Sequence, residues 1–210
     1  VVVREPVELV IHTRGGRVEL RQGDRQALAY KARVRTGGVA IEDPGLLEGG
    51  DAPTLPLETF YDDITFHGPL LQGLTAIDAV GDGFIRGRLR AGTPAAWEPG
   101  TTREAFTVDP YALDSAMQLS AYVAWIRFGR AGTPVGLGRL VQLAPLPQGT
   151  DITVEVVFGD MEGDRFSGTL RLREPGTGRL LAVAEDVVAE LRQAEGDDAE
   201  DAEEPFEITP

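Results

Sequence analysis

The sequence contains no cysteine, and this absence removes several kinds of chemistry at once. Disulfide bonds, thiolate nucleophiles and cysteine-based zinc sites are excluded, and a reducing, cytoplasmic compartment is favoured. Histidine is scarce as well, because the chain has two, His12 and His67. Two isolated histidines do not make a set of metal ligands, so neither a metal nor a bound cofactor is expected.

Long apolar runs and basic stripes are also missing. No stretch approaches the roughly 20 apolar residues that a membrane-crossing helix needs, so no membrane partner is expected. The formal net charge is −14, and eight of the acids lie in EGDDAEDAEEPFEITP (195–210), which contains no base; removing these eight charges leaves −6. Residues 193–210 are therefore predicted to be a disordered acidic tail or linker, with docking to a basic partner as the alternative. Without a basic stripe to contact phosphates, nucleic acid is not expected as a partner.

The apolar pattern that remains predicts an α+β fold built on antiparallel strands. Near the N-terminus, alternating residues and tight turns predict three strands, at 7–12, 17–22 and 25–34. Three strands without a helix cannot close a core of their own. Residues 36–59 are rich in Gly and Pro and are predicted to be a linker. After it, two strands, one long helix and four strands predict an antiparallel sheet around one central helix.

The long helix is expected from Asp109 to about Arg127. Asp109 can accept the unpaired N–H groups of the first turn, and Pro110 suits the first helical position. Apolar residues occupy nearly the whole circumference, which predicts a helix buried on all sides. Asp114 and Gln118 are the exceptions, and their spacing of four places them on one face, where Gln118 can donate an amide hydrogen to the carboxylate. Burial would raise the pKa of Asp114 and suit it to act as a general acid; alternatively, Asp114 only bonds a donor in the packed interior.

Three segments resemble motifs of the dehydratase domains of modular polyketide synthases and polyunsaturated fatty acid synthases. FHGPLLQGL (66–74) resembles (Y/F)-x-G-P-x-(F/L)-Q-G-L, and DPYALDSAMQ (109–118) resembles H-P-x-x-L-D-x-x-x-Q. PVGLGRLVQLAPLP (134–147) resembles the strand that follows the family's helix, and the order and spacing of all three match. The resemblance implies a hotdog fold, in which an antiparallel sheet wraps round a central helix, as part of a double hotdog. Residues 60–192 would be the second hotdog, and residues 1–35 the closing strands of a first, incomplete one.

The resemblance also implies a reaction and partners. Domains of this family eliminate water from a 3-hydroxyacyl group that is tethered through phosphopantetheine to an acyl carrier protein, alongside other synthase domains. The family takes its base, a His, from the first hotdog and its acid, an Asp, from the helix of the second. By motif position Asp114 is that acid and Gln118 its orienting neighbour. The substrate-binding candidates are Leu113, Met117, His67, Gly68 and Pro69, and residues 136–143 are candidates for further walls of the channel. A homodimer is compatible with the resemblance, because hotdog folds commonly associate.

One part of the family pattern is missing. The motif H-x-x-x-G-x-x-x-x-P, which carries the family's catalytic His, does not occur. His12 lies in an N-terminal strand outside any such motif, and His67 occupies the variable second position of the F-x-G-P turn, so neither is the expected base. Three explanations for the missing motif stay open: a fragment whose missing part carries the base, a split domain completed by a partner chain, or a degenerate dehydratase kept for acyl binding or scaffolding. The chain also starts without Met, which favours the first of them. The chain alone is therefore expected to be weak or inactive as a dehydratase, and a related isomerase or cyclase is a further alternative.

Overall fold

The computed structural model describes residues 9–23, 27–98 and 100–192 of the 210-residue chain. The chain divides into two compact units, Val1–Glu42 and Asp43–Pro210, and each is described by itself. The predicted acidic tail, 193–210, lies outside the described residues. No helix among the described residues is long and apolar enough to cross a membrane.

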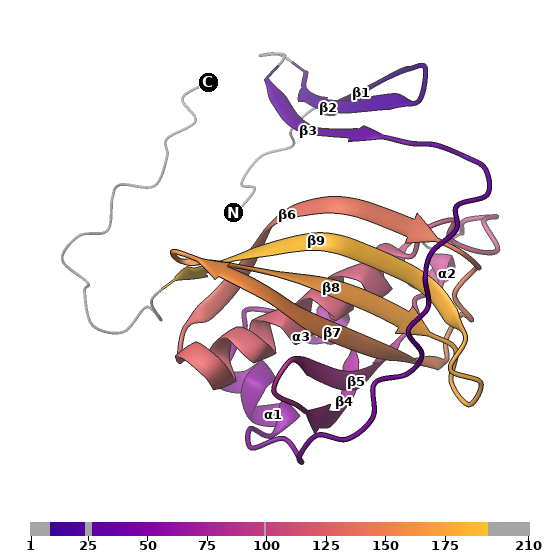
Figure 1. The fold of residues 1–210 in the computed structure, drawn as a ribbon. Helices are drawn as coiled ribbons and strands as arrows, with labels where there is room; N and C mark the ends of the chain where they lie inside the picture. The colour runs from indigo at the N-terminus through magenta and orange to yellow at the C-terminus, as the bar shows by residue number, and fades with distance from the viewer. Residues whose placement is uncertain (1–8, 24–26, 99, 193–210) are drawn as a thin grey trace. The chain divides into compact units, whose positions relative to one another are not determined.

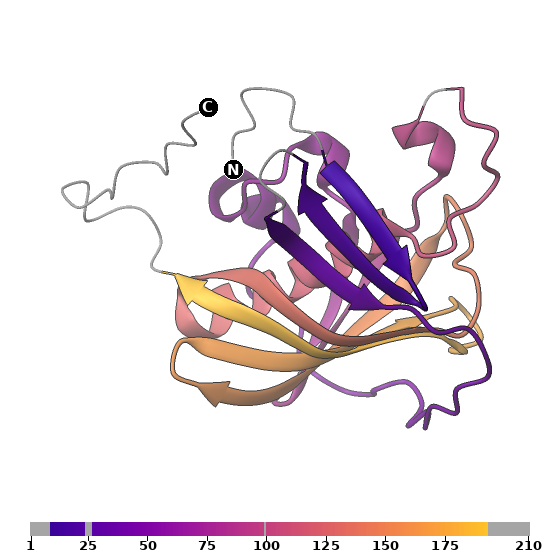
Figure 2. The same ribbon diagram turned by 90° about the horizontal axis from the view of Figure 1, so that it is seen from above.

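The first unit holds a three-stranded antiparallel meander, which confirms the predicted N-terminal strands (Figure 2). Its strands are β1 (Leu9–Arg14), β2 (Arg17–Gln22) and β3 (Leu28–Arg33). The register pairs His12 with Glu19 and Glu19 with Lys31, so these polar side chains share one face of the sheet. The alternate face carries apolar residues that include Ile11 and Tyr30, which are 65% and 74% exposed. Within this unit the meander therefore has no core of its own, as the sequence predicted.

The second unit is a six-stranded antiparallel sheet with one long helix along a face (Figure 1). Its strands are β4 (Leu74–Val80), β5 (Phe84–Arg90), β6 (Ala131–Gln142), β7 (Asp151–Glu162), β8 (Arg165–Arg173) and β9 (Leu180–Arg192), in the order β4-β5-β7-β8-β9-β6. Its helices are α1 (Leu57–Thr59), α2 (Pro94–Trp97) and α3 (Pro110–Phe128); a π-helical turn (Phe60–Ile64) and a 3-10 turn (Pro69–Leu71) precede β4. The predicted hairpin, central helix and four following strands are all present, so the α+β architecture is confirmed.

The start of α3 is fixed by its first residues. Asp109 Oδ1 accepts hydrogen bonds from the backbone N–H groups of Tyr111 at 3.0 Å and Ala112 at 3.1 Å. Its Oδ2 accepts from the N–H of Gly92 at 2.6 Å, which ties the helix to the chain just after β5. At the other end Gly129, with φ of 61°, takes the left-handed conformation that commonly ends a helix. Asp109 is thus a helix cap, as predicted.

The core lies between α3 and the sheet. Small and apolar residues of α3 fill it from the helix side: Ala112, Ala116, Leu119, Tyr122 and Val123. The expectation that α3 is buried on all sides is wrong for one face, because the side chain of Asp114 is 43% exposed and Met117 and Ala121 are partly exposed. The sheet covers only part of the helix circumference, and these residues lie on the face that it leaves open to a pocket.

On the opposite face of the sheet, two buried charges hold part of the predicted linker. Glu155 of β7 and Arg173 of β8 are both fully buried, with 2.6 Å between Oε2 and Nε. Arg173 also donates to the carbonyl of Gly45 at 2.6 Å and pairs with Asp43 at 2.9 Å, while Glu155 Oε1 accepts from the N–H of Leu47 at 2.6 Å. Residues 43–47 therefore run across the sheet as a bound strap, and Figure 1 shows this segment passing over the strands.

Candidate active site

The centre of the candidate site is the predicted pair on α3. Gln118 Nε2 donates to Asp114 Oδ2 at 2.7 Å and also to the carbonyl oxygen of Leu71 at 2.7 Å. Gln118 Oε1 accepts from the hydroxyl of Tyr61 at 2.7 Å, and that hydroxyl accepts from the N–H of Leu74 at 2.9 Å. Both ends of the Gln118 amide are therefore occupied, and its orientation is fixed with the nitrogen toward Asp114. The prediction that Gln118 donates to the carboxylate is confirmed.

The pair spans the boundary between the core and the pocket. Gln118 is 2% exposed, whereas the side chain of Asp114 is 43% exposed. Burial raises the pKa of Tyr61 far above its usual range, so its hydroxyl keeps its proton and remains a donor to Gln118. The buried amide thus holds a carboxyl group that can still meet a ligand.

His67 approaches Asp114 from the 66–74 segment. Its Nε2 lies 3.8 Å from Asp114 Oδ2, and its side chain is 12% exposed. Its Nδ1 forms a hydrogen bond with Thr65 Oγ1, and its ring stacks on Phe66 with centroids 4.5 Å apart and planes 19° apart. Gln72 Nε2 donates to its backbone carbonyl at 3.0 Å. Burial lowers the pKa of His67, and this effect exceeds the opposite influence of the Asp114 carboxylate.

The 66–74 segment reaches α3 closely because Gly73 has no side chain. A Cβ atom at Gly73 would lie 1.8 Å from Ser115 Oγ and 2.8 Å from Ser115 Cβ, distances that packed side chains essentially never adopt. Ser115 Oγ is itself held by donating to the carbonyl of Tyr111 at 2.8 Å. Glycine therefore permits the close backbone approach that brings this segment to the helix face of Asp114.

Asp114, Gln118 and His67 line a pocket of about 170 Å³. Its walls are mostly apolar, and its lining residues are Phe60, Ile64, Thr65, Phe66, His67, Asp114, Met117, Gln118, Ala121, Ala131, Gly132, Thr133 and Pro134. An apolar cleft with a few convergent polar groups suits a small acyl chain that presents a polar end to Asp114 and His67. Among the described residues, no group of three or more His, Asp and Glu side chains is arranged to hold a metal ion.

The predicted site residues divide into two groups. Four of them line this pocket: Asp114, Gln118, Met117 and His67. The other three do not line it: Leu113, Gly68 and Pro69. The strand after the helix contributes 131–134 to the wall, whereas the prediction named 136–143. The catalytic and binding roles of all these residues stay predictions.

Sequence reasoning missed Tyr61 and Thr65. Tyr61 fixes Gln118, and Thr65 contacts the His67 ring. Both precede the F-x-G-P turn by a few positions, in FYDDITFHGP. That closeness to a motif was the available indication, but an aromatic residue in a short turn fits a packing role equally well.

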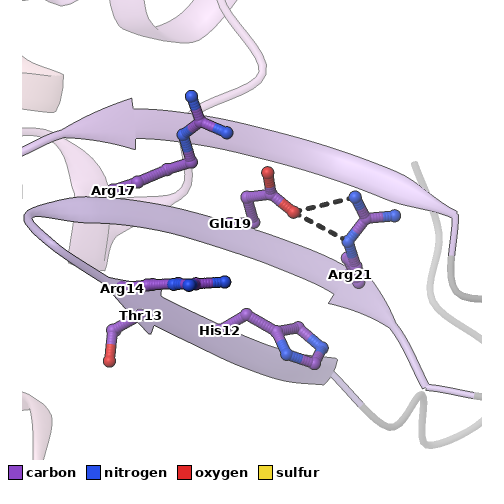
Figure 3. Close-up of a pocket in the computed structure, with 6 residues that line it drawn as sticks. All are labelled: His12, Thr13, Arg14, Arg17, Glu19 and Arg21. Atoms are coloured by element: carbon purple, nitrogen blue, oxygen red, sulfur yellow. Dashed lines mark hydrogen bonds and ion pairs between the residues drawn. The ribbon is translucent and has the colours of Figure 1, made fainter.

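A second pocket, of about 410 Å³, lies on the N-terminal unit (Figure 3). Its lining comes from β1 and β2: His12, Thr13, Arg14, Arg17, Glu19 and Arg21. Arg21 Nη2 lies 2.8 Å from Glu19 Oε2, and this hydrogen bond lowers the pKa of Glu19. Cationic side chains predominate, so this surface suits an anion and lacks the apolar walls that an acyl chain needs.

Comparison with known proteins agrees with the fold and the motifs. The family model described as "Polyketide synthase dehydratase N-terminal domain" matches residues 42–197. A search of curated protein sequences gave no match.

Several solved structures share the fold. An isomerase-inactive variant of GphF DH1 is 18% identical, with a TM-score of 0.66 over 90% of this chain and 68% of that one. The dehydratase domain of RzxB from Pseudomonas fluorescens is 20% identical, with a TM-score of 0.58 over 88% and 67%. The dehydratase domain of PpsC from Mycobacterium tuberculosis, solved in complex with C12:1-CoA, is 22% identical, with a TM-score of 0.58 over 87% and 66%. The chain thus spans about two thirds of their length, and the similarity confirms the predicted hotdog fold.

Proposed function

Starting from the fact that this chain belongs to the polyketide synthase dehydratase family, we propose that it eliminates water from 3-hydroxyacyl thioesters to give enoyl thioesters. The observation that carries the proposal is the carboxyl group of Asp114, held by Gln118 at the edge of a mostly apolar pocket. Family membership supports the reaction class, and this geometry supports Asp114 as the residue for the acid step.

In this proposal Asp114 protonates the departing hydroxyl group. Gln118 Nε2 bonds Oδ2 of the carboxyl group, which leaves Oδ1 to carry the acidic proton toward the substrate. A positioned general acid contributes roughly 10²- to 10⁴-fold to a rate. Gln118 cannot rotate away without losing its bonds to Tyr61 and Leu71, so the acid is presented in one orientation.

The acyl group would arrive on the phosphopantetheine arm of an acyl carrier protein, within an assembly that includes other synthase domains. Elimination of water needs no bound cofactor, since a proton acceptor and a proton donor suffice. The pocket walls at Met117, Ala121 and Phe60 would contact the acyl chain. A homodimer remains part of the proposal because of the hotdog fold.

The acid assignment is tested with Asp114→Asn. The 3-hydroxybutyryl thioester of pantetheine is supplied to the 210-residue chain and to the longest reading frame that contains it, and the enoyl thioester is followed by its ultraviolet absorbance. We expect the substitution to lower turnover at least about 100-fold. Asp62→Asn is the matched control, because Asp62 is an exposed carboxylate of the preceding turn. Unchanged dehydration by Asp114→Asn would contradict the proposal.

A non-catalytic module is the competing function, and one observation favours it. The family's H-x-x-x-G-x-x-x-x-P motif is not in this chain. A module of this kind would bind an acyl pantetheine thioester but would not convert the 3-hydroxybutyryl thioester, either as the 210-residue chain or within the longest reading frame. Binding and turnover measured side by side therefore separate the two functions.

A further inference from the structure

The three strands of the first unit bring together arginines that are separated in the sequence. Arg14 of β1 is directly opposite Arg17 of β2, and Arg17 is directly opposite Arg33 of β3. Residues that are directly opposite in an antiparallel sheet share one face, and neighbouring strands lie about 4.8 Å apart. We propose that this arginine row is a binding site for the dianionic phosphate group of a small phosphate monoester. The inference concerns a site other than the acyl pocket and does not rest on the proposed function.

The first support is that the row has no counter-charge. Arg14, Arg17 and Arg33 are exposed, and none of them makes a side-chain hydrogen bond or an ion pair with another described residue. Glu19 is the one acid on the three described strands, and Arg21 binds it through Nε at 3.0 Å and Nη2 at 2.8 Å. Figure 3 draws this contact and none for Arg14 or Arg17. Like charges that are directly opposite destabilise a sheet, so a bound anion would relieve the repulsion along the row.

The second support is the charge of the whole face. Lys31 is directly opposite Glu19 and therefore belongs to the same face as the row. The face carries one acid, Glu19, and five cations: Arg14, Arg17, Arg21, Lys31 and Arg33. Its formal charge is thus +4, in a chain whose net charge is −14, which leaves −18 (−14 − 4) for the remainder. A long polyanion such as nucleic acid would be repelled by that remainder, whereas a compact dianion needs only this face.

The third support is the pocket over β1 and β2. Its volume of about 410 Å³ lies within the range of small-ligand pockets, roughly 300–1,000 Å³. Its charged lining is Arg14, Arg17, Arg21 and Glu19, which gives +2 with His12 neutral. A phosphate monoester carries about −1.5 to −2 at pH 7, so the two charges balance. Guanidinium groups also donate pairs of parallel hydrogen bonds to phosphate oxygens.

The turn between the two central arginines is held in place. Gly15 and Gly16 have φ of 54° and 75°, the left-handed values of a two-residue hairpin turn. The carbonyl oxygen of Gly16 accepts from the N–H of Val34 at 2.7 Å, and a Cβ atom at Gly16 would lie 2.5 Å from the oxygen of Val34. The hairpin is therefore tied to the residue that follows Arg33. Because the backbone of all three arginines is fixed in advance, less ordering is needed when an anion binds.

The test uses phenyl phosphate and phenyl sulfate, two ligands of similar shape that differ in charge. Phosphorus NMR follows the titration of phenyl phosphate with the 210-residue chain at low salt, and phenyl sulfate and a short DNA duplex are then added as competitors. The variant is Arg14→Gln/Arg17→Gln. Arg88→Gln/Arg90→Gln is the matched control, because these exposed arginines of β5 already pair with acids. Both double variants lose two positive charges.

We expect phenyl phosphate to bind saturably, with one site per chain. Arg14→Gln/Arg17→Gln should bind it at least about 10-fold more weakly, because hydrogen bonds to a charged group are lost. The control variant should keep the affinity within about two-fold, since distant exposed charges are screened. Phenyl sulfate should bind about 10-fold more weakly than phenyl phosphate. Thermal unfolding checks that the variants are folded, and Arg33→Gln, on another strand, gives a second comparison that should also weaken binding.

Four results would overturn the inference. The first is no saturable binding of phenyl phosphate, and the second is an equal loss of affinity in the two double variants, which would show an effect of net charge alone. The third is binding of phenyl sulfate as tight as that of phenyl phosphate. The fourth is preferential binding of the DNA duplex, which would assign the face to nucleic acid. None of these results involves Asp114 or the acyl pocket, so the proposed function is tested independently.

Discussion

Replacing Tyr61 by Phe deletes one hydroxyl group that makes two buried hydrogen bonds. That hydroxyl donates to Gln118 Oε1 at 2.7 Å and accepts from the N–H of Leu74 at 2.9 Å. Gln118 is 2% exposed and Leu74 4%, so water has little access to either partner group. A buried polar group without a partner costs about 1–3 kcal/mol, and two such groups give about 2–6 kcal/mol. Tyr61→Phe should therefore lower the free energy of unfolding by an amount in that range.

Tyr122→Phe is the matched control. The hydroxyl of Tyr122 makes one bond of this kind, to the carbonyl oxygen of Leu55 at 2.6 Å, and Tyr122 is fully buried, whereas Tyr61 is 9% exposed. Its loss should cost about 1–3 kcal/mol, because a single acceptor is left unsatisfied. Urea denaturation of both variants at equal protein concentration gives the two free energies, and the slope of each transition checks that the folded states are comparable.

The same substitution has a functional consequence. Without the Tyr61 hydroxyl, the Gln118 amide is held through Nε2 alone, by its bonds to Leu71 and Asp114, so its orientation toward Asp114 is less firmly fixed. Turnover of the 3-hydroxybutyryl thioester should fall in Tyr61→Phe and stay close to normal in Tyr122→Phe. The reasoning fails if Tyr61→Phe costs less than Tyr122→Phe, or if it is destabilised as expected but keeps full turnover.

Two further predictions concern packing and buried charge. Gly73→Ala should destabilise the fold by about 1–3 kcal/mol or more, because the added Cβ would meet Ser115. Gly68 has open space around it, so Gly68→Ala is the control and should change stability by less than about 0.5 kcal/mol. Thermal unfolding of both variants measures the difference. Arg173→Met should lower the free energy of unfolding, measured by urea denaturation, by about 3–5 kcal/mol, because Glu155 is left buried without its cation. The Arg173→Met/Glu155→Leu double variant should recover much of that loss. Equal stability of Arg173→Met and the parent chain would contradict this account.

The parts of the site that the sequence predicted are those set by local geometry. Asp109 followed by Pro110 fixes where α3 begins, because the cap and the first helical position have well-defined residue preferences. A spacing of four places Asp114 and Gln118 one turn apart on any helix, so their contact followed from the sequence. The alternation of apolar residues likewise identified the strands that cover α3.

The parts that were not predictable depend on segments that are distant in the sequence. The exposure of Asp114 is decided by which elements cover the helix, and an apolar circumference does not show that the sheet leaves one face open. The approach of His67 requires Gly73 to pack against Ser115, a contact across more than forty residues. Tyr61 was missed for the same reason, since its hydroxyl matters only once Gln118 is placed beside it.

The hydrogen bonds around Gln118 link the stability of the fold to the geometry of the site. A buried amide without partners would be costly, so Gln118 is tolerated in the core because Tyr61 and Leu71 satisfy it. Leu71 ends the 3-10 turn and Leu74 begins β4, so the bonds that satisfy the amide also hold the segment that carries the pocket wall. Any change that loosens this segment must therefore move the group that orients Asp114. For this reason substitutions at Tyr61 should reduce stability and turnover together, although Tyr61 itself does not line the pocket.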